Sequence, residues 1–251
     1  MPTVYFISDF HLFSDVNANS SSLDREKKIV LWLESISHDT GILHLVGDIF
    51  DYWFEYKTVV PKGGVRLLGK LATMHDNGWE IHYHVGNHDM WVGSYIKDEI
   101  GLIIHTEPLL IQYGNKKFFI AHGDGLGSGD IKYKIIRFLL RSKFNQFLFA
   151  RIHPNLGLYI MKASSLASRK AHNEKPTMDN LNEERLYKFA NDHSKLHNVD
   201  FYVFGHRHLP STILLENNSS FYICLGDWLK FCTYGIYAEE NGGFELKSYA
   251  I

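Results

Sequence analysis

The sequence predicts an α/β protein, and two patterns in its first hundred residues support this class. Apolar runs at residues 3–8 and 42–46 each end in a polar cluster, and residues 23–37 between them have apolar side chains at helical spacing. A predicted helix over 65–75 and a strand over 80–85 repeat this order. Repetition of β-α-β units favours a sheet with parallel strands, whose carboxyl ends are where such sheets bind ligands.

The remaining chain predicts a second sheet and an inserted helical segment. Residues 102–121 predict short strands with a turn at 114–115, and the last fifty residues alternate strands with turns at 217–218 and 241–243. We expect this second, mixed sheet to pack against the first. Residues about 130–196 have a helical pattern interrupted at Pro154 and Pro176, so we expect a helical cap inserted in a single catalytic domain over 1–251.

The composition is that of an ordinary globular protein. Of 251 residues, 45% are hydrophobic and 22% are charged, which excludes disordered and fibrous classes. Cys224 and Cys232 do not resemble a secreted disulfide framework, and we expect free, buried thiols. The first residues have the pattern of a strand, and no apolar run approaches the roughly 18–20 residues of a membrane span. We therefore expect a cytoplasmic protein, either soluble or attached to a membrane surface.

The net charge of −2 is unevenly distributed along the chain. Residues 130–175 contain ten Lys and Arg against two Asp and Glu, a balance of +8. This basic, aromatic segment predicts contact with an anionic membrane surface and a groove for acyl chains. Alternatively, its apolar residues pack the cap onto the core, or the segment holds nucleic acid. Its apolar members are Ile135, Ile136, Phe138, Leu139, Leu140, Phe144, Phe147, Leu148 and Phe149, and its basic members are Lys132, Lys134, Arg137, Arg141, Lys143 and Arg151.

Five short polar motifs stand at the ends of predicted strands, and each supplies one or two nitrogen or oxygen donors. Glycines precede Asp48, Asn87 and His206, and one follows His122. Because glycine permits tight turns and close backbone approach, the neighbouring side chains can converge on one small volume. The motifs are Asp9-Phe10-His11, Gly47-Asp48-Ile49-Phe50-Asp51, Gly86-Asn87-His88-Asp89, His122-Gly123-Asp124 and Gly205-His206-Arg207-His208.

These motifs together predict a site for two metal ions. Each motif alone is weak, because Gly-Asp is usually a turn and His-x-His often only packs on one face of a strand. Carboxylate, imidazole and amide donors without thiolate suit Mn²⁺, Fe or Zn²⁺, and Asp48 is the natural carboxylate bridge for a pair of ions. Such a pair activates water and neutralises phosphate charge, which favours a phosphoesterase. The expected ligands are Asp9, His11, Asp48, Asn87, His122, His206 and His208.

The five motifs resemble those of the calcineurin-like metallophosphoesterases. The resemblance implies a four-layer α-β-β-α sandwich of two mixed sheets. It also implies a catalytic role for Asn87 and His88, with His88 protonating the leaving group or binding phosphate and Asp89 orienting it. We expect Asp124 to support His122. The implied ligand sets are Asp9, His11, Asp48 and His208 for the first metal, and Asp48, Asn87, His122 and His206 for the second.

Within that family the chain is similar to the UDP-2,3-diacylglucosamine pyrophosphatases of lipid A biosynthesis, through Ser8–Leu12, Gly47–Phe50, His122–Leu126 and the cap. This likeness implies a nucleotide-lipid substrate, UMP and 2,3-diacylglucosamine 1-phosphate as products, Mn²⁺ as the metal, and attachment to the inner face of the cytoplasmic membrane. The implied substrate-binding residues are Asn87, His88, Asp130, Ser168, His172, Lys175 and His206.

Two departures from that group leave the substrate open. His88 stands where an arginine is usual, and Asp51 where a glutamate is usual. Both residues are normal in the wider family, so another phosphodiesterase, a nucleotidase or a nuclease remains an alternative. A catalytically silent scaffold is disfavoured, because no expected ligand is missing. The remaining histidines have no motif around them, and we expect them to be structural or exposed: His44, His82, His84, His105, His153, His193 and His197.

Overall fold

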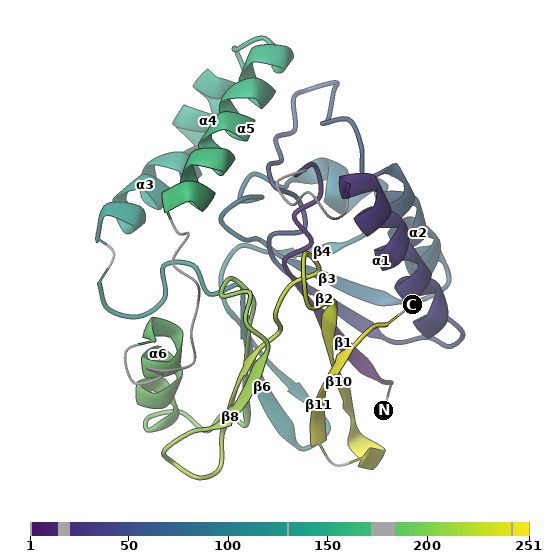
Figure 1. Ribbon diagram of the computed structural model, residues 1–251, viewed down its shortest axis with the longest axis vertical. Helices are drawn as coiled ribbons and strands as arrows, with labels where there is room; N and C mark the ends of the chain where they lie inside the picture. Colours follow the sequence, from purple (N-terminus) through teal and green to yellow (C-terminus); the bar gives the residue numbers. More distant parts are fainter. Residues whose placement is uncertain (1, 15–20, 130, 172–183, 242, 251) are drawn as a thin grey trace.

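Two mixed β-sheets lie face to face in the computed structural model, which describes residues 2–14, 21–129, 131–171, 184–241 and 243–250. Helices cover the outer face of each sheet (Figure 1). The predicted α/β class with two mixed sheets is therefore confirmed. The predicted β-α-β opening is also present.

The first sheet has the strand order β11-β10-β1-β2-β3-β4. Strands β1 to β4 are parallel to one another, whereas β10 runs antiparallel to β1, and β11 antiparallel to β10. The parallel strands place their carboxyl ends at one edge, so the polar residues that follow them meet there. The strands are β1 (Val4–Ile7), β2 (Ile42–Val46), β3 (Glu80–His84), β4 (Ile103–His105), β10 (Thr233–Ala238) and β11 (Gly243–Ser248).

The second sheet has the order β5-β6-β7-β9-β8. Strands β6, β7 and β9 are parallel, and the edge strands β5 and β8 pair antiparallel with β6 and β9. The strands are β5 (Leu109–Tyr113), β6 (Lys116–Ala121), β7 (Phe201–Phe204), β8 (Ser211–Leu214) and β9 (Phe221–Cys224).

Three apolar clusters hold the layers together. Helices α1 (Ser22–Ile36) and α2 (Val65–Asp76) bury Trp32 and Leu67 against the outer face of the first sheet. Phe6 and Phe118 belong to the cluster between the two sheets. Helix α6 (Arg185–Ser194) buries Leu186 against the outer face of the second sheet, which completes the order helix, sheet, sheet, helix (Figure 1).

Helices α3 (Ile131–Arg141), α4 (Lys143–Phe149) and α5 (Pro154–Ala171) stand beyond the strand ends, with α4 and α5 at the upper left of Figure 1 and α3 below them. We call these three helices the cap. The expected insertion over 130–196 also included α6, but α6 lies against the second sheet because its apolar face is buried there. The break expected at Pro154 is the start of α5.

The cap contacts the body through aromatic side chains. Trp91 Nε1 donates to the Leu140 carbonyl at 2.7 Å, and the Phe149 ring lies 4.9 Å from the Trp91 ring and 4.8 Å from that of Phe54. Two short helical turns, η1 (Tyr95–Glu99) and η3 (Glu239–Asn241), complete the described elements. Within the described residues, none of the helices is both long and apolar enough to cross a bilayer.

Both cysteines are free thiols, as expected. Cys224 is buried, whereas Cys232 is only half-buried.

Candidate metal centre

The loops that follow β1, β2, β3, β6 and β7 bring all seven expected ligands to one edge of the sheets. Backbone hydrogen bonds join the first two loops, from Asp9 N to the Gly47 carbonyl at 3.1 Å and from His11 N to the Asp48 carbonyl at 3.0 Å. The side chains of Asp9, His11 and Asp48 are at most about 2% exposed. These contacts hold the two loops in register.

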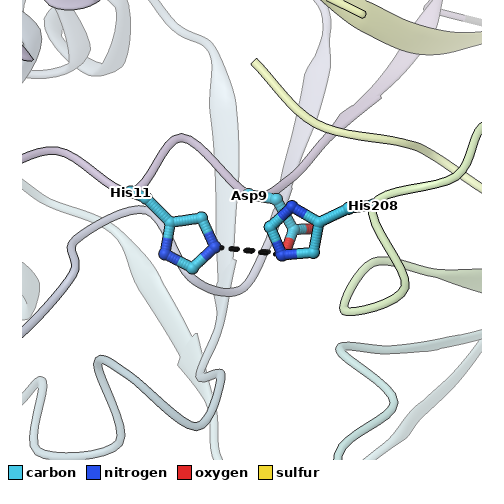
Figure 2. A group of neighbouring side chains, drawn as sticks. All are labelled: Asp9, His11 and His208. Atoms are coloured by element: carbon cyan, nitrogen blue, oxygen red, sulfur yellow. Dashed lines mark hydrogen bonds and ion pairs between the residues drawn. The ribbon is translucent and has the colours of Figure 1, made fainter. Parts of the chain in front are cut away.

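Figure 2 shows the first group, which contains Asp9, His11 and His208. The Nε2 atoms of the two imidazoles lie 3.3 Å apart. Asp9 Oδ1 is 3.6 Å from His11 Nε2 and 3.3 Å from His208 Nε2, and it is buried without a hydrogen bond from any described residue. A buried carboxylate oxygen that faces two ring nitrogens in this way fits a shared cation.

The second group contains Asp48, His122 and His206, with Asn87 beside it. His122 Nδ1 donates to the Val46 carbonyl at 2.9 Å, which directs Nε2 toward the site. That Nε2 lies 3.2 Å from both Asp48 Oδ2 and Asn87 Oδ1. Two oxygen acceptors and a ring nitrogen therefore surround one small volume, and this donor set also fits a cation.

Asp48 lies between the two groups. Its Oδ2 atom is 3.2 Å from His122 Nε2 and 3.8 Å from His11 Nε2, while Oδ1 accepts a hydrogen bond from His88 N at 2.9 Å. His11, Asp48 and His88 form a third group that could hold a metal ion. The position of Asp48 is the one that a bridging carboxylate needs.

The electrostatics of the site favour ionised carboxylates. Burial opposes ionisation, yet His208 and His11 lower the pKa of Asp9 to about 2. Burial likewise opposes ionisation of Asp48, but His122 and His88 hold its pKa well below 3.8. These carboxylates are therefore ready to bind a cation at neutral pH.

Two imidazoles of the second group have opposite pKa shifts. Burial and the adjacent His122 lower the pKa of His206 to about 4, so its ring is neutral at neutral pH. Despite burial, Asp48 raises the pKa of His122 well above 6.5. A metal-bound imidazole must be neutral, so a cation at this position would replace a proton on His122.

Sequence reasoning missed Asp227. His208 Nδ1 lies 3.1 Å from Asp227 Oδ2, and Asp227 Oδ1 accepts hydrogen bonds from the backbone N–H groups of Lys230 and Phe231. The carboxylate thus directs Nε2 of His208 toward Asp9. A signal was present, because Gly226-Asp227 comes shortly after a strand, as Gly47-Asp48 does.

Arg25 was also missed, and nothing in the sequence distinguishes it from other arginines on an amphipathic helix. It is 3% exposed on α1 and donates to the carbonyls of Phe10, His11 and Ser14 at 2.7–2.8 Å. These three bonds hold the loop that carries the first two ligands.

Asp89 does not occupy the position expected for a partner of His88. Its Oδ2 atom accepts hydrogen bonds from Ile49 N at 2.8 Å and from the Tyr83 hydroxyl, and its Oδ1 atom accepts from Gly86 N at 2.8 Å. Burial and then the charge of Asp48 raise the pKa of Asp89 to about 6. Asp89 therefore joins the loops after β2 and β3.

The carboxylate beside the His88 ring is that of Asp51. His88 Nδ1 is 3.0 Å from the Asp51 carbonyl, 3.7 Å from Asp51 Oδ1 and 3.2 Å from Ser165 Oγ on α5. A cap residue thus reaches the edge of the site.

Asp124 also differs from its expected role beside His122, whose Nδ1 is held by the Val46 carbonyl. Asp124 Oδ2 instead accepts a hydrogen bond from the Tyr133 hydroxyl at 2.7 Å and lies 3.5 Å from Arg137 Nε. The residue fastens α3 to the body.

The four expected cap and loop contacts with substrate are only partly described. Ser168 is half-buried on α5, one helical turn after Ser165. Asp130, His172 and Lys175 lie outside the described residues.

No protein-family profile matches the sequence. The chain is 36% identical to UDP-2,3-diacylglucosamine hydrolase of Porphyromonas gingivalis over 93% of each chain. It is 26% identical to the Haemophilus influenzae protein of the same name over 96% of each. An archaeal phosphodiesterase structure aligns with a TM-score of 0.47 at 14% identity, covering 98% of this chain and 99% of that one. On the sequence similarity, the chain belongs to the family of the UDP-2,3-diacylglucosamine hydrolases.

Proposed function

We propose that the chain is a two-metal hydrolase that cleaves the pyrophosphate of UDP-2,3-diacylglucosamine to UMP and 2,3-diacylglucosamine 1-phosphate. The observation that carries the proposal is the 36% identity to the Porphyromonas gingivalis hydrolase over 93% of both chains. An alignment of that extent cannot leave out the whole of the cap, residues 131–171. The alignment therefore includes part of the cap as well as most of the body, which supports a shared substrate.

Each ligand group is assigned to one metal ion. We assign Asp9, His11, Asp48 and His208 to one metal, and Asp48, Asn87, His122 and His206 to the other. When bound, the two ions, which we propose to be Mn²⁺, supply an activated water and neutralise phosphate charge. Asp48 supports this assignment because its Oδ2 atom faces an imidazole of each set, at 3.8 and 3.2 Å.

His88 is the residue that we assign to the phosphate of the substrate. Its backbone N–H is fixed by Asp48 Oδ1 at 2.9 Å, and its Nδ1 atom faces Asp51, so the ring is held at the edge of the metal groups. A phosphate monoester leaving group needs little protonation, so binding rather than acid catalysis is the role that this reaction requires. We propose that Asn87 and His206 contact the same phosphate. Asp130, Ser168, His172 and Lys175 would hold the sugar phosphate and the nucleotide.

The cap supports a lipid substrate and attachment to the cytoplasmic face of a membrane. Phe138, Phe144 and Tyr159 are 77%, 68% and 69% exposed, so they do not pack the cap onto the body. Exposed aromatic side chains beside Lys143 and Arg151 suit an anionic lipid surface. This position would bring the site to the acyl chains.

The proposal is tested by measuring UMP release from UDP-2,3-diacylglucosamine by Mn²⁺-loaded protein, together with bound metal per chain. We expect Asp48→Ala and His122→Ala to reduce UMP release to background and to reduce bound Mn²⁺. The exposed His38 gives a matched control, and His38→Ala should retain both properties. Full turnover by the metal-loaded Asp48→Ala protein would refute the assigned mechanism.

The substrate is tested separately with a panel of nucleotide sugars, nucleotides, an aryl phosphodiester and single-stranded DNA. We expect the nucleotide-lipid with both acyl chains to have the highest kcat/KM. A higher kcat/KM for a nucleotide or for DNA would indicate a nucleotidase or a nuclease. That result would refute the lipid substrate but not the metal site.

A further inference from the structure

Ser165 is a buried cap residue whose hydroxyl group faces the metal centre. It is 6% exposed, whereas the preceding Lys162, Ala163 and Ser164 on α5 are exposed. Its Oγ atom donates to Asp51 Oδ2 at 2.7 Å and lies 3.2 Å from His88 Nδ1. A hydroxyl of the cap therefore reaches a carboxylate that follows β2 in the body.

Asp51 connects this hydroxyl to two imidazoles of the site. The Asp51 side chain is 2% exposed, and its Oδ1 atom lies 3.3 Å from His11 Nδ1 and 3.7 Å from His88 Nδ1. His11 presents its other ring nitrogen to Asp9 and His208. A carboxylate placed this close behind a ligand imidazole favours one orientation of the ring.

The Ser165 hydroxyl holds one oxygen of this carboxylate. Rotation about the last side-chain torsion of an aspartate is soft, so a carboxylate needs partners to hold one orientation. The bond from Ser165 engages Oδ2, while Oδ1 of the same carboxylate faces His11 and His88. Loss of a hydrogen bond to a charged group costs more than loss of a neutral one.

We infer that Ser165 is a positioning residue, which sets Asp51 and through it His88 and His11 for phosphate chemistry. This inference rests on the proposed function only in taking these histidines as part of a phosphoesterase site. Docking of the cap then completes the catalytic site. The Phe149 contacts with Phe54 and Trp91 hold α4 against the body and support this docking.

The test compares Ser165→Ala, Ser165→Thr and Ser164→Ala, each loaded with Mn²⁺, on the aryl phosphodiester bis(p-nitrophenyl) phosphate and on UDP-2,3-diacylglucosamine. We expect Ser165→Ala to lower kcat about ten-fold on both substrates with KM changed less than about two-fold. Ser165→Thr keeps the hydroxyl and should recover most of kcat. Ser164→Ala removes an exposed hydroxyl on the same helix and should leave kcat unchanged.

A double-mutant cycle tests the route through Asp51. In an Asp51→Ala background, Ser165→Ala should lower kcat by less than about two-fold further, because Asp51→Ala already removes the contact that Ser165 makes. Additive losses, an unchanged kcat in Ser165→Ala, or a rise in KM alone would each overturn the inference. The thermal unfolding midpoint of each variant shows whether a lower kcat results from unfolding or from displacement of the Asp51 carboxylate in a folded protein.

The two substrates separate this inference from the proposed function. Turnover of the phosphodiester without turnover of the nucleotide-lipid by the wild type would refute the lipid substrate alone. The kcat values of the Ser165 and Ser164 variants on the phosphodiester would still test the inference in that case.

Discussion

Five of the seven expected ligands have a backbone φ angle in the left-handed region, which residues with a Cβ atom rarely adopt. The angles are 55° at Asp9, 45° at His11, 52° at Asp48, 67° at His206 and 55° at His208. Each such conformation costs on the order of 1–3 kcal/mol and persists only where its surroundings hold it. The Asp9 carboxylate, which accepts a hydrogen bond from His206 N at 3.0 Å, is one such support. Strain in these loops is therefore part of how the side chains converge.

Gly86 gives a prediction at this scale. A Cβ atom there would overlap Asp48 Oδ1 and lie 2.6 Å from the Asp48 backbone nitrogen. Because Asp48 lies between both ligand groups, we expect Gly86→Ala to displace its carboxylate and weaken Mn²⁺ binding at least ten-fold. Isothermal titration calorimetry with Mn²⁺ measures the change, and circular dichroism checks that the fold is retained.

Gly69 is the matched control for that substitution. A Cβ atom added at Gly69, within α2, meets no other atom within 4 Å. Alanine is the better helix former, so Gly69→Ala should raise the free energy of unfolding by about 0.5–1 kcal/mol and leave Mn²⁺ affinity unchanged. Equal Mn²⁺ affinity in Gly86→Ala and Gly69→Ala would contradict the packing argument.

At the scale of elements, strands β2, β3 and β4 place four histidines side by side. His44 Nδ1 is 2.9 Å from His84 Nε2, and His44 Nε2 is 2.7 Å from the Tyr113 hydroxyl. His82 Nδ1 is 2.9 Å from His105 Nε2. The expectation that these histidines are structural agrees with their positions, since His44, His82 and His84 are buried.

This cluster predicts acid sensitivity. Burial, and then the neighbouring imidazoles, lower the pKa of His44 and of His84 well below 6.5. The unfolded chain binds a proton at each histidine near pH 6.5, and the folded chain does not. Stability present above that pH is therefore lost as the pH falls, by about 1.4 kcal/mol per pH unit for each histidine.

Urea unfolding of the metal-free protein at pH 7.5 and pH 5.5 measures this loss. We expect His44→Gln to lose about 1 kcal/mol less stability than the wild type between these pH values, because one buried titrating group is removed. His38→Gln changes an exposed histidine and should keep the wild-type pH dependence. The same pH dependence in all three proteins would exclude the cluster as the cause.

Sequence patterns predict those features of the fold and the site that depend on the spacing of residues close together in the chain. The opening strands and α1 follow from periodicity, and the five motifs stand at strand ends because glycine turns mark them. The contact between Asp51 and Ser165 is different, since 114 positions separate the two residues and no periodicity relates them. The Gly226-Asp227 pair marks Asp227 as a candidate in the sequence, but its pairing with His208 follows from the neighbouring positions of β7 and β9 in the sheet.

At the scale of the whole molecule, part of the basic segment makes contacts within the protein. Arg137 lies 3.5 Å from Asp124, Arg141 lies 2.9 Å from Glu107, and Lys134 donates to the Gly127 carbonyl at 2.6 Å. These three cations fasten α3 to the body. The positive charge that the sequence predicted for a membrane is thus partly used within the protein, and the exposed aromatic side chains become the stronger argument for a lipid surface.

Those side chains give the prediction for the whole molecule. Burying one phenylalanine in a lipid interface contributes about 1.5–3 kcal/mol, so Phe138→Ser with Phe144→Ser should weaken binding to phosphatidylglycerol vesicles at least ten-fold. Co-sedimentation measures the bound fraction, which should also fall as salt screens the remaining cations. Leu196 is 82% exposed outside the cap, so Leu196→Ser should bind like the wild type. Equal binding by the wild type, the Phe138→Ser Phe144→Ser variant and the Leu196→Ser variant would mean that these cap side chains do not contact the lipid.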